Sequence, residues 1–322
     1  MQLDSIRSLV EEDFQAVDHL ISAAFQSKAS IINNLGNYIT QSGGKRIRPL
    51  VVLLLTKACQ YSGHQHTTLA AIIELIHTAT LLHDDVVDNA PFRRGKETAN
   101  SKWGNEAAVL VGDYLYSKAF QMLAAFDRPA IMNLLTDATN TMAEGEALQL
   151  LERYNANITE QDYLNIIRCK TAKLFEVSAQ LSGILSQVNP TLELALAEYG
   201  LHLGTAFQLM DDILDYDASL ESTGKKIGND LAEGKVTLPL IYILQNGKKE
   251  EMQIIQTAIQ EGGYHHLPII QEIILSSGAI DHTKRLAKVE AAKAKAALAQ
   301  LKPSSYCEAA ITLADFAIER DY

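Results

Sequence analysis

Residues 68–87 read TLAAIIELIHTATLLHDDVV, a long apolar stretch that ends in neighbouring carboxylates. Apolar side chains fall on every side of a helix with this sequence, which is typical of a helix buried in a protein core. Residues 207–215, FQLMDDILD, repeat the arrangement later in the chain. Neighbouring ionised aspartates repel each other, and burial raises the cost of keeping them charged. Something must therefore offset the negative charge at the end of each helix.

Helical periodicity dominates the rest of the chain, and strand-like alternation is nearly absent. Apolar-rich segments recur at residues 104–126, 130–151, 160–187, 191–216 and 237–246. All seven prolines fall at plausible helix starts or in loops, where proline is tolerated. The sequence contains no repeat of solenoid period and no linker rich in Pro, Gly or Ser. We therefore expect residues 1–322 to form a single all-α domain, a bundle of ten or more helices.

The composition narrows the range of functions. A formal net charge of −11 over 322 residues argues against nucleic acid as the main partner, because binding to phosphate backbones needs a basic surface. The three cysteines lie far apart without a CxxC pair, so the sequence predicts neither a disulfide framework nor a zinc site. The N-terminus lacks a signal-peptide pattern, and no apolar run is long enough to span a bilayer. We expect a cytoplasmic protein without a transmembrane segment.

The acidic stretches have the geometry of a metal site. Because each residue of a helix advances by about 100°, Asp84 and Asp88 are neighbours on one face, whereas Asp85 lies to the side, within reach of water bound to an ion. The second motif has the same spacing, with Asp211, Asp212 and Asp215. Oxygen ligands without His or Cys favour a hard cation, and Mg²⁺ typically combines a few carboxylates with waters and substrate phosphates. A solvated acidic helix end is the alternative for one motif, but two motifs on strongly apolar helices favour the metal site.

Positive charge gathers in three regions close to these motifs. They hold Lys45, Arg46 and Arg48 in GGKRIRP (43–49), Arg93 and Arg94 in PFRRGK (91–96), and Lys225, Lys226 and Lys235 in GKKIGND (224–230) and EGKVTLP (233–239). Arginine offers a planar fork for phosphate oxygens, and lysine offers a compact charge. Each region alone is more often a solvated loop. Together they bracket two carboxylate clusters and favour a cavity that handles a diphosphate through Mg²⁺.

Some neighbouring positions have both a functional and a structural interpretation. His77 lies nearly two turns before Asp84 and points the same way, although most histidines on apolar helices are satisfied core residues. Gln208 lies three residues before the second motif, and the Lys170–Thr171 pair lies midway along another central helix. The residues alone leave these alternatives open.

With these motifs the chain resembles the all-α trans-prenyltransferases that make polyprenyl diphosphates. The resemblance covers nearly the whole chain and rests on GGKRIRP, LLHDDVVD followed by RRG, GEALQL (145–150), KTA (170–172), FQLMDDILD, and GKKIGND followed by EGKVTLP. The motif sequences and the length are most similar to those of the bacterial octaprenyl diphosphate synthases, which supply quinone side chains. The charged motif positions show no departure from the family pattern, and the first motif lacks the two-residue insertion of bacterial farnesyl enzymes. The resemblance implies the isoprenoid synthase fold around a central apolar cavity, and a homodimer.

The resemblance also implies roles for the motif residues. Asp84 and Asp88 would hold two Mg²⁺ ions and Asp211 a third, while the remaining motif aspartates, Asp85, Asp212 and Asp215, would act mostly through water. The allylic diphosphate, expected to be farnesyl diphosphate, would be bound by Arg93, Lys170, Thr171, Gln208, Lys225 and Lys235. Isopentenyl diphosphate would be bound by Lys45, Arg48, His77 and Arg94, and Gln149 would line the cavity.

The expected reaction is a chain elongation. Metal ions and cationic side chains stabilise the departing diphosphate, isopentenyl diphosphate attacks the allylic cation, and the released diphosphate takes the proton. Ala79 and Thr80 occupy the positions where bulky side chains stop growth in the family. Both are small, which favours a long product, and the overall resemblance predicts eight units. Deeper floor candidates, each equally compatible with plain core packing, are Ile72, Ile73, Ile76, Phe120, Met122 and Leu123.

Alternatives remain open on the sequence. A class I terpene cyclase is also all-α, but it would need neither the second aspartate motif nor the GGKRIRP turn. The chain could also be the catalytic chain of a heterodimeric hepta- or nonaprenyl diphosphate synthase. A non-catalytic partner subunit is disfavoured because such subunits usually lack intact aspartate motifs. The sequence does not predict whether Arg320 and the tail after it fold over the active site.

Overall fold

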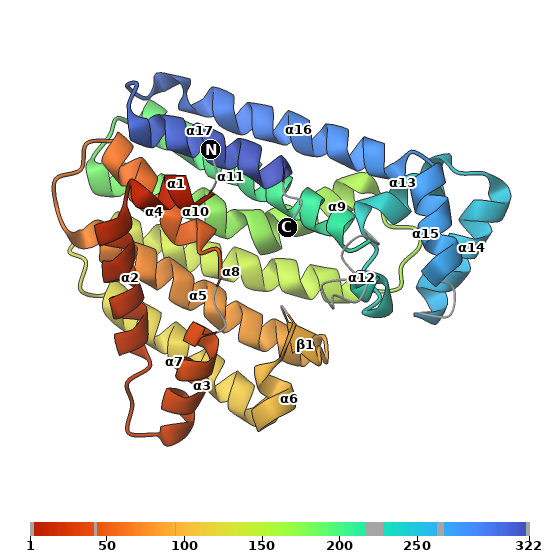
Figure 1. The fold of residues 1–322 in the computed structure, drawn as a ribbon, viewed down its shortest axis with the longest axis horizontal. Helices are drawn as coiled ribbons and strands as arrows, with labels where there is room; N and C mark the ends of the chain where they lie inside the picture. Colours follow the sequence, from red (N-terminus) through yellow and green to blue (C-terminus); the bar gives the residue numbers. More distant parts are fainter. Residues whose placement is uncertain (1–2, 42–43, 94, 217–227, 263–266, 320–322) are drawn as a thin grey trace. The chain divides into compact units, whose positions relative to one another are not determined.

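The computed structural model describes residues 3–41, 44–93, 95–216, 228–262 and 267–319 (Figure 1). This part of the chain is almost entirely helical, and its strand pairing is limited to a short antiparallel hairpin of β1 (Phe92–Arg93) and β2 (Lys96–Glu97). The predicted all-α fold with ten or more helices is therefore confirmed.

Backbone contacts divide the chain into two compact units, each assembled from separate stretches of sequence. Unit 1 comprises Met1–Thr136, Val177–Ala197 and Leu298–Leu313, and unit 2 comprises Asp137–Glu176, Glu198–Ala297 and Ala314–Tyr322. The first aspartate motif belongs to unit 1 and the second to unit 2. The expectation of a single domain over residues 1–322 stays a prediction.

Unit 1 is built around α5 (Gln65–Val87), which packs against α7 (Asn105–Leu123), α4 (Ile47–Ala58) and α2 (Glu11–Ala24) (Figure 1). The apolar residues of α5 are nearly all buried, which confirms the helix expected at 68–87. Burying a side chain of the size of Ile or Leu contributes about 1.5–3 kcal/mol, so this helix dominates the core. The remaining short helices are α1 (Leu3–Ser8), α3 (Ser30–Gln41), α6 (Ala99–Trp103) and the 3₁₀ turn η4 (Leu298–Gln300).

Unit 2 has its own core, in which α13 (Leu238–Asn246) packs against α16 (Ala279–Ala297) and α9 (Glu160–Ile167). Tyr163 and Tyr216 are among its buried side chains. The other helices of this unit are α12 (Asn229–Ala232), α14 (Lys249–Glu261) and α15 (Leu267–Ser276).

Several described helices contribute residues to both units: α8 (Pro129–Leu151), α10 (Lys173–Ser186), α11 (Pro190–Leu214) and α17 (Ser305–Ile318). Helices α8 and α11 begin at a proline, whose missing N–H is not needed in the first turn. Between α9 and α10 the chain forms a π-helical turn, η1 (Arg168–Ala172), which the sequence did not predict. None of the described helices combines the length and the apolar character that a membrane crossing requires.

Candidate active site

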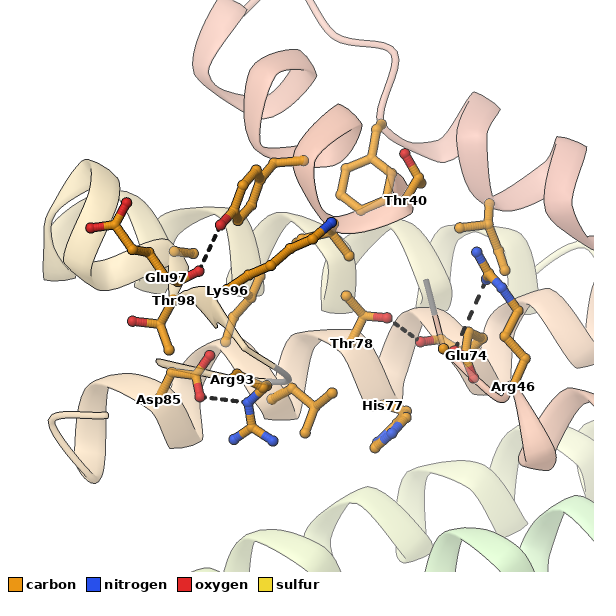
Figure 2. A pocket seen from close by; sticks show the side chains of 18 residues that line it. Thr40, Arg46, Glu74, His77, Thr78, Asp85, Arg93, Lys96, Glu97 and Thr98 are labelled. Atoms are coloured by element: carbon orange, nitrogen blue, oxygen red, sulfur yellow. Dashed lines mark hydrogen bonds and ion pairs between the residues drawn. The ribbon is translucent and has the colours of Figure 1, made fainter. Parts of the chain in front are cut away.

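The first acidic helix end lies where α5 approaches the β1–β2 hairpin (Figure 2). Asp84 and Asp88 are half-buried, whereas Asp85 is only 4% exposed. Oδ1 of Asp85 accepts a hydrogen bond from Nε of Arg93 at 2.7 Å. The middle aspartate is thus neutralised by an arginine of the hairpin. An indirect, water-mediated role for Asp85 is compatible with this pairing.

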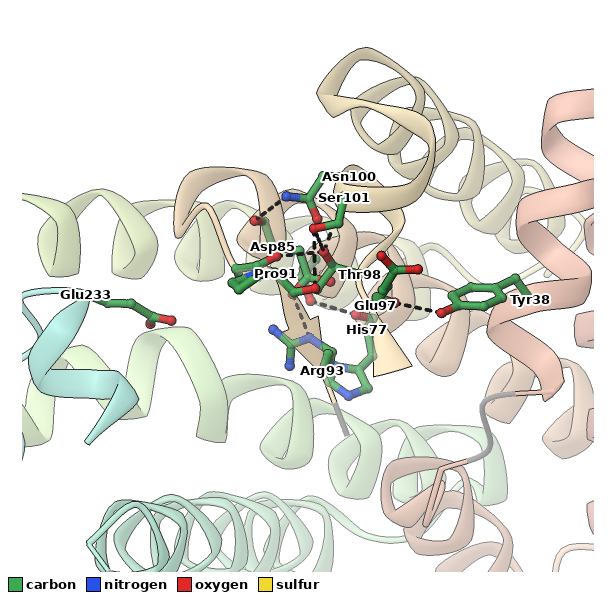
Figure 3. A network of polar contacts seen from close by, with 12 residues as sticks. Tyr38, His77, Asp85, Pro91, Arg93, Glu97, Thr98, Asn100, Ser101 and Glu233 are labelled. Atoms are coloured by element: carbon green, nitrogen blue, oxygen red, sulfur yellow. Dashed lines mark hydrogen bonds and ion pairs between the residues drawn. The ribbon is translucent and has the colours of Figure 1, made fainter. Parts of the chain in front are cut away.

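A polar network fixes the hairpin that carries Arg93 (Figure 3). The N–H of Ala90 donates to the Asp85 carbonyl at 3.0 Å, and the side-chain amide of Asn100 donates to the same oxygen at 3.1 Å. The Thr98 hydroxyl donates to the Ala90 carbonyl at 2.6 Å. The end of α5 and the hairpin therefore form one connected structure, which orients Arg93 towards Asp85. Arg94 lies outside the described residues.

The basic side chains of the segment that leads into α4, Lys45, Arg46 and Arg48, have different contacts; Arg48 itself lies in the first turn of the helix. Nη1 of Arg48 donates to Nε2 of His77 at 3.1 Å, so two of the expected isopentenyl diphosphate ligands lie together. Arg46 instead pairs with Asp18 at 3.1 Å and lies 4.0 Å from Glu74. Arg46 therefore holds the turn against α2 and α5, and the functional candidates of the turn are Lys45 and Arg48.

A side chain of α1 binds the backbone of the same segment. Nη2 of Arg7 donates to the Lys45 carbonyl at 2.5 Å. In Figure 2 the His77 ring and the Arg93 guanidinium extend to the same side of α5, away from Thr40. The expectation that His77 points the same way as Asp84 stays a prediction.

A pocket of unit 1 runs along α5 between α2, α3 and the hairpin, and encloses about 870 Å³ of space that is partly open to solvent (Figure 2). Its apolar lining comes from Ile21, Phe25, Ile39, Leu81 and Leu82. The Asp85–Arg93 pair borders it on one side and the Arg46–Glu74 pair on the other. Because this pocket belongs to one unit, the central apolar cavity stays a prediction.

Small residues precede the first motif on α5. Ala79 is fully buried, and Thr80 is half-buried with its hydroxyl bonded to the His77 carbonyl at 2.8 Å. The deeper floor candidates divide into fully buried Ile72, Ile73, Ile76 and Leu123, and half-buried Phe120 and Met122. Core packing accounts for the fully buried ones, and a role in chain length stays a prediction.

An aromatic stack on α7 stands beside the first motif. The Tyr116 ring lies 6.2 Å from the His83 ring and 6.4 Å from the Phe120 ring, both stacked. Burial, with a contribution from the charge of Asp84, raises the pKa of Tyr116 to about 12. Gly112 allows this approach, because a Cβ there would lie 2.3 Å from Nε2 of His83. Tyr116 therefore lies close to the motif, although its sequence position gave no signal.

The second acidic helix end, on α11, is more deeply buried. Asp212 is 1% exposed; its Oδ2 accepts a short hydrogen bond from the Tyr163 hydroxyl, and its Oδ1 accepts from the Gln208 amide at 2.9 Å. Burial, and then the nearby charge of Asp230, raise the pKa of Asp212 well above its usual value. Asp211 is half-buried. The middle aspartate is again engaged by the protein, but here by neutral donors.

Residues 228–235, which follow the second motif, are hydrogen-bonded to it. Oδ2 of Asp215 accepts from the Asp230 N–H at 3.1 Å, and the Asp230 carbonyl accepts from the Lys235 N–H at 2.8 Å. Nζ of Lys235 pairs with Glu233 at 2.6 Å. These bonds hold the backbone of Lys235 in the same unit as the motif. Lys225 lies outside the described residues.

Lys170 and Thr171 lie on the π turn η1, a kind of turn that frequently marks functional sites. Nζ of Lys170 donates to Oε1 of Gln149 at 2.7 Å and forms an ion pair with Glu146. The Thr171 hydroxyl donates to Oε1 of Gln208 at 3.0 Å. The turn is therefore fastened to α8 by one side chain and to α11 by the next.

Two glycines make room for this turn. A Cβ on Gly145 of α8 would lie 2.7 Å from the backbone nitrogen of Lys170, and one on Gly204 of α11 would lie 2.7 Å from Cα of Ala172. Both distances are shorter than any normal contact. The neighbouring helices thus leave the space that the π turn needs.

The donor chemistry of both motifs fits Mg²⁺. The described His, Cys, Asp and Glu side chains form no ready-made group of three around one point. Mg²⁺ does not require one, because it keeps several waters and completes its shell with substrate phosphates. Burial, and then the charges of Asp230 and Asp211, raise the pKa of Asp212, and a bound cation would favour its ionised form. The residues that would hold the ions are Asp84, Asp88 and Asp211.

Sequence reasoning missed some members of the site. Glu146 lies three residues before Gln149 and shares its helix face, so GEALQL contained a signal for it. Asp230 stands in GKKIGND, where only the lysines were considered. Tyr163 had no signal, because its partner lies on a different helix. Arg320 lies outside the described residues.

Comparison with known proteins points to one family. Residues 29–273 match the sequence model of the family described as polyprenyl synthetase. The chain is 47% identical to an octaprenyl diphosphate synthase of Escherichia coli (strain K12), over 100% of both chains. It is 43% identical to an octaprenyl diphosphate synthase of Haemophilus influenzae, over 100% of this chain and 98% of that one.

Solved structures agree with this result. A polyprenyl synthase of Caulobacter crescentus, complexed with calcium and isoprenyl diphosphate, has a TM-score of 0.95 and 40% identity over 100% of this chain and 98% of that one. A decaprenyl diphosphate synthase of Rhodobacter capsulatus has a TM-score of 0.93 and 36% identity over 99% of each chain. The predicted fold class and the predicted resemblance are confirmed.

Proposed function

The chain belongs to the polyprenyl synthetase family and is a prenyltransferase, and from this premise we propose that it adds isopentenyl diphosphate units head-to-tail to farnesyl diphosphate until it has made octaprenyl diphosphate for a quinone side chain. The observation that carries the proposal is a carboxylate-rich end of a buried helix, accompanied by basic side chains, once in each unit. In unit 1, Arg93 pairs with Asp85 of the motif, and in unit 2, Lys170 pairs with Glu146 and belongs to the same unit as Asp211.

The allylic diphosphate is the leaving group of the reaction. Enzymes of this family generally use magnesium, and three bound Mg²⁺ ions would neutralise the departing diphosphate. Asp84, Asp88 and Asp211 are proposed to hold these ions, while Asp85, Asp212 and Asp215 orient the bound water. The side chains proposed to bind the diphosphate oxygens are Arg93, Lys170, Thr171, Gln208, Lys225 and Lys235. The ion pair with Glu146 holds the Lys170 side chain in place, which supports this assignment.

The second substrate is proposed to bind at the basic turn of unit 1. Lys45, Arg48 and Arg94 supply positive charge for its diphosphate, and His77 joins them. The contact from Arg48 to Nε2 of His77 makes that ring nitrogen an acceptor, so the ring proton is on Nδ1. His77 therefore orients the guanidinium of Arg48.

For the carbon–carbon bond to form, the two substrates must be positioned against each other and water must be excluded. The double bond of isopentenyl diphosphate attacks the allylic cation, and the proton lost from the product passes to the released diphosphate. Apolar walls protect the cation from water. No side chain has to act as a general base in this scheme.

The length of the product is proposed to depend on the apolar part of α5. Ala79 and Thr80 leave the path along this helix open, which supports a product longer than farnesyl or geranylgeranyl diphosphate. The full-length similarity to octaprenyl diphosphate synthases supports eight units.

The enzyme is proposed to act as a cytoplasmic homodimer. Val109 and Leu110 on α7 are 37% and 65% exposed, an apolar face that a second copy would cover. Analytical ultracentrifugation of the purified chain tests this, with a monomer as the contradicting result.

One incubation tests the central proposal. The purified chain alone, supplied with farnesyl diphosphate, isopentenyl diphosphate and Mg²⁺, should release an octaprenyl product on chromatography. Activity only after addition of a second polypeptide would favour a heterodimeric synthase. Hydrocarbon released from farnesyl diphosphate alone would favour a terpene cyclase. A folded chain that binds neither substrate would favour a non-catalytic subunit.

A further inference from the structure

A continuous hydrogen-bond chain runs through unit 2 from a buried tyrosine to the π turn. The Tyr163 hydroxyl donates to Oδ2 of Asp212, and Nε2 of Gln208 donates to Oδ1 of the same carboxylate at 2.9 Å. Oε1 of Gln208 accepts from the Thr171 hydroxyl at 3.0 Å. Tyr163 is 4% exposed and Asp212 is 1% exposed, so bulk water does not compete for these bonds.

The hydrogen bonds give the amide of Gln208 a definite orientation. Its NH₂ group faces Oδ1 of Asp212 and its carbonyl oxygen faces the Thr171 hydroxyl. Thr171 must then give its single hydroxyl proton to Gln208. Its oxygen is left as an acceptor, while the Gln208 amide has a second N–H. The carboxylate thus determines which polar atoms the π turn and α11 present.

We propose that Tyr163 is a positioning residue of the allylic diphosphate site, where its phenol fixes the Asp212 carboxylate that orients Gln208 and, through it, Thr171. This inference rests on the proposed function, in which Gln208 and Thr171 contact that diphosphate. Tyr163 itself contacts neither substrate.

The surroundings of Tyr163 suit such a role. Helix α9 begins with a capping box, in which the Asp162 N–H donates to the Thr159 hydroxyl oxygen at 3.1 Å, so the helix has a fixed start. The phenol donates its single proton to the motif carboxylate. Removal of the phenol oxygen leaves Oδ2 without this donor and lets the carboxylate turn, which releases the Gln208 amide from its orientation.

A double-mutant cycle separates positioning from simple core filling. Tyr163→Phe removes only the hydroxyl at one end of the chain, and Thr171→Val removes the hydroxyl at the other. The matched control is Tyr242→Phe, because Tyr242 is a half-buried tyrosine of the same unit that stacks on His282 at 4.8 Å. Calorimetric titration with farnesyl thiolodiphosphate and Mg²⁺ measures binding without turnover. Steady-state kinetics give the KM of each substrate, and urea unfolding confirms that each variant is folded.

We expect Tyr163→Phe to weaken thiolodiphosphate binding about tenfold, the size typical of a hydrogen bond to a charged group. The KM for farnesyl diphosphate should rise by a similar factor, while the KM for isopentenyl diphosphate changes less than about twofold. Because both hydroxyls act through one chain, the double variant should bind no more weakly than the weaker single variant.

Two results would overturn the inference: binding by Tyr163→Phe equal to that by Tyr242→Phe, or losses that multiply in the double variant. Either would leave the proposed function intact, since the wild-type chain would still bind and elongate. A wild-type chain that does neither would contradict the proposed function itself.

Discussion

The two acidic motifs have the same spacing but different electrostatic surroundings. In unit 1, Asp85 is paired with the cation Arg93 at 2.7 Å. In unit 2, Asp212 accepts hydrogen bonds from the neutral groups of Tyr163 and Gln208, and burial, followed by the negative charge of Asp230, raises its pKa well above the usual value. The same sequence pattern therefore gives one motif whose middle carboxylate is paired with a cation and another whose middle carboxylate has only neutral donors beside a negative neighbour.

The helices that carry the motifs differ in a second way. The positions four and five residues before the first motif hold Thr80 and Ala79, whereas the corresponding positions before the second hold Phe207 and Ala206. The Phe207 ring packs against Phe175 with ring centroids 5.6 Å apart. Small side chains thus precede the first motif and a packed aromatic ring precedes the second, which is consistent with the proposal that the product grows along α5.

The largest expected effect concerns the first aspartate of each motif, which both motifs share. Asp84→Asn and Asp211→Asn should each lower kcat roughly 100- to 1,000-fold, the loss expected when a group that stabilises the departing charge is removed. Incorporation of labelled isopentenyl diphosphate measures the rate. Asp137→Asn on α8, an exposed aspartate outside both motifs, is the control. Full activity in Asp211→Asn would show that only the first motif serves the reaction.

Product length should respond at one motif only. Ala79→Phe places an aromatic ring in the path along α5, and we expect products of a few isoprene units in place of the long chain. Phe207→Leu, at the second motif, should leave the length unchanged. Reversed-phase chromatography of the dephosphorylated products gives the answer. Long products from Ala79→Phe would mean that the chain grows along a different helix.

Substitution of the carboxylates that pair with Arg93 and Lys170 should have opposite effects on the kinetics. Asp85→Asn removes the partner of Arg93, so the guanidinium loses its orientation and kcat/KM should fall about tenfold.

Glu146→Gln removes a carboxylate that competes with substrate for Lys170, so the KM for farnesyl diphosphate should fall about threefold, the scale of a partly exposed ion pair. Titration of farnesyl diphosphate in steady-state assays measures both. A rise in KM for Glu146→Gln would show that the glutamate orients the lysine for substrate.

Helix positions could be predicted from the sequence because apolar periodicity and prolines act locally. The segment expected at 191–216 is α11 (Pro190–Leu214), and the one at 237–246 is α13 (Leu238–Asn246). The π turn could not be predicted, since it needs the space left by Gly145 and Gly204 on other helices. The hairpin at 92–97 was missed because its two-residue strands carry no periodic signal.

The motif residues of the candidate site could be named from the sequence, but their partners could not. The spacing within one helix places Asp84 beside Asp88 and separates Asp85 from both. Which group engages the middle aspartate depends on tertiary contacts, and these supply Arg93 in one unit and Tyr163 in the other. The division into a balanced and an unbalanced motif is therefore a property of the fold.

The smallest expected effects are on the free energy of unfolding. Glu290, a buried carboxylate outside the motifs, serves as the reference with which Asp212 is compared. Burial would raise the pKa of Glu290, but hydrogen bonds from His202 and Lys293 outweigh it and hold the pKa at about 2. The ionised form therefore stabilises the fold above pH 4.5, and this contribution is lost as the pH falls towards 2. Glu290→Gln should lower the free energy of unfolding by on the order of 2 kcal/mol at pH 7 and by much less at pH 3, as measured by urea unfolding.

Asp212 should show the opposite sign in the same measurement. Because its pKa is raised in the folded protein, keeping Asp212 ionised costs stability at every pH above its unfolded value near 3.8. Asp212→Asn should therefore raise the free energy of unfolding at pH 7 in EDTA, whereas Glu308→Gln, at an exposed position, should leave it unchanged. Added Mg²⁺ with pyrophosphate should stabilise the wild-type chain more than Asp212→Asn, because only the wild type has that charge to relieve. A loss of stability for Asp212→Asn in EDTA would show that the bonds from Tyr163 and Gln208 already hold the charge, and the two motifs would then differ in partners but not in their need for a cation.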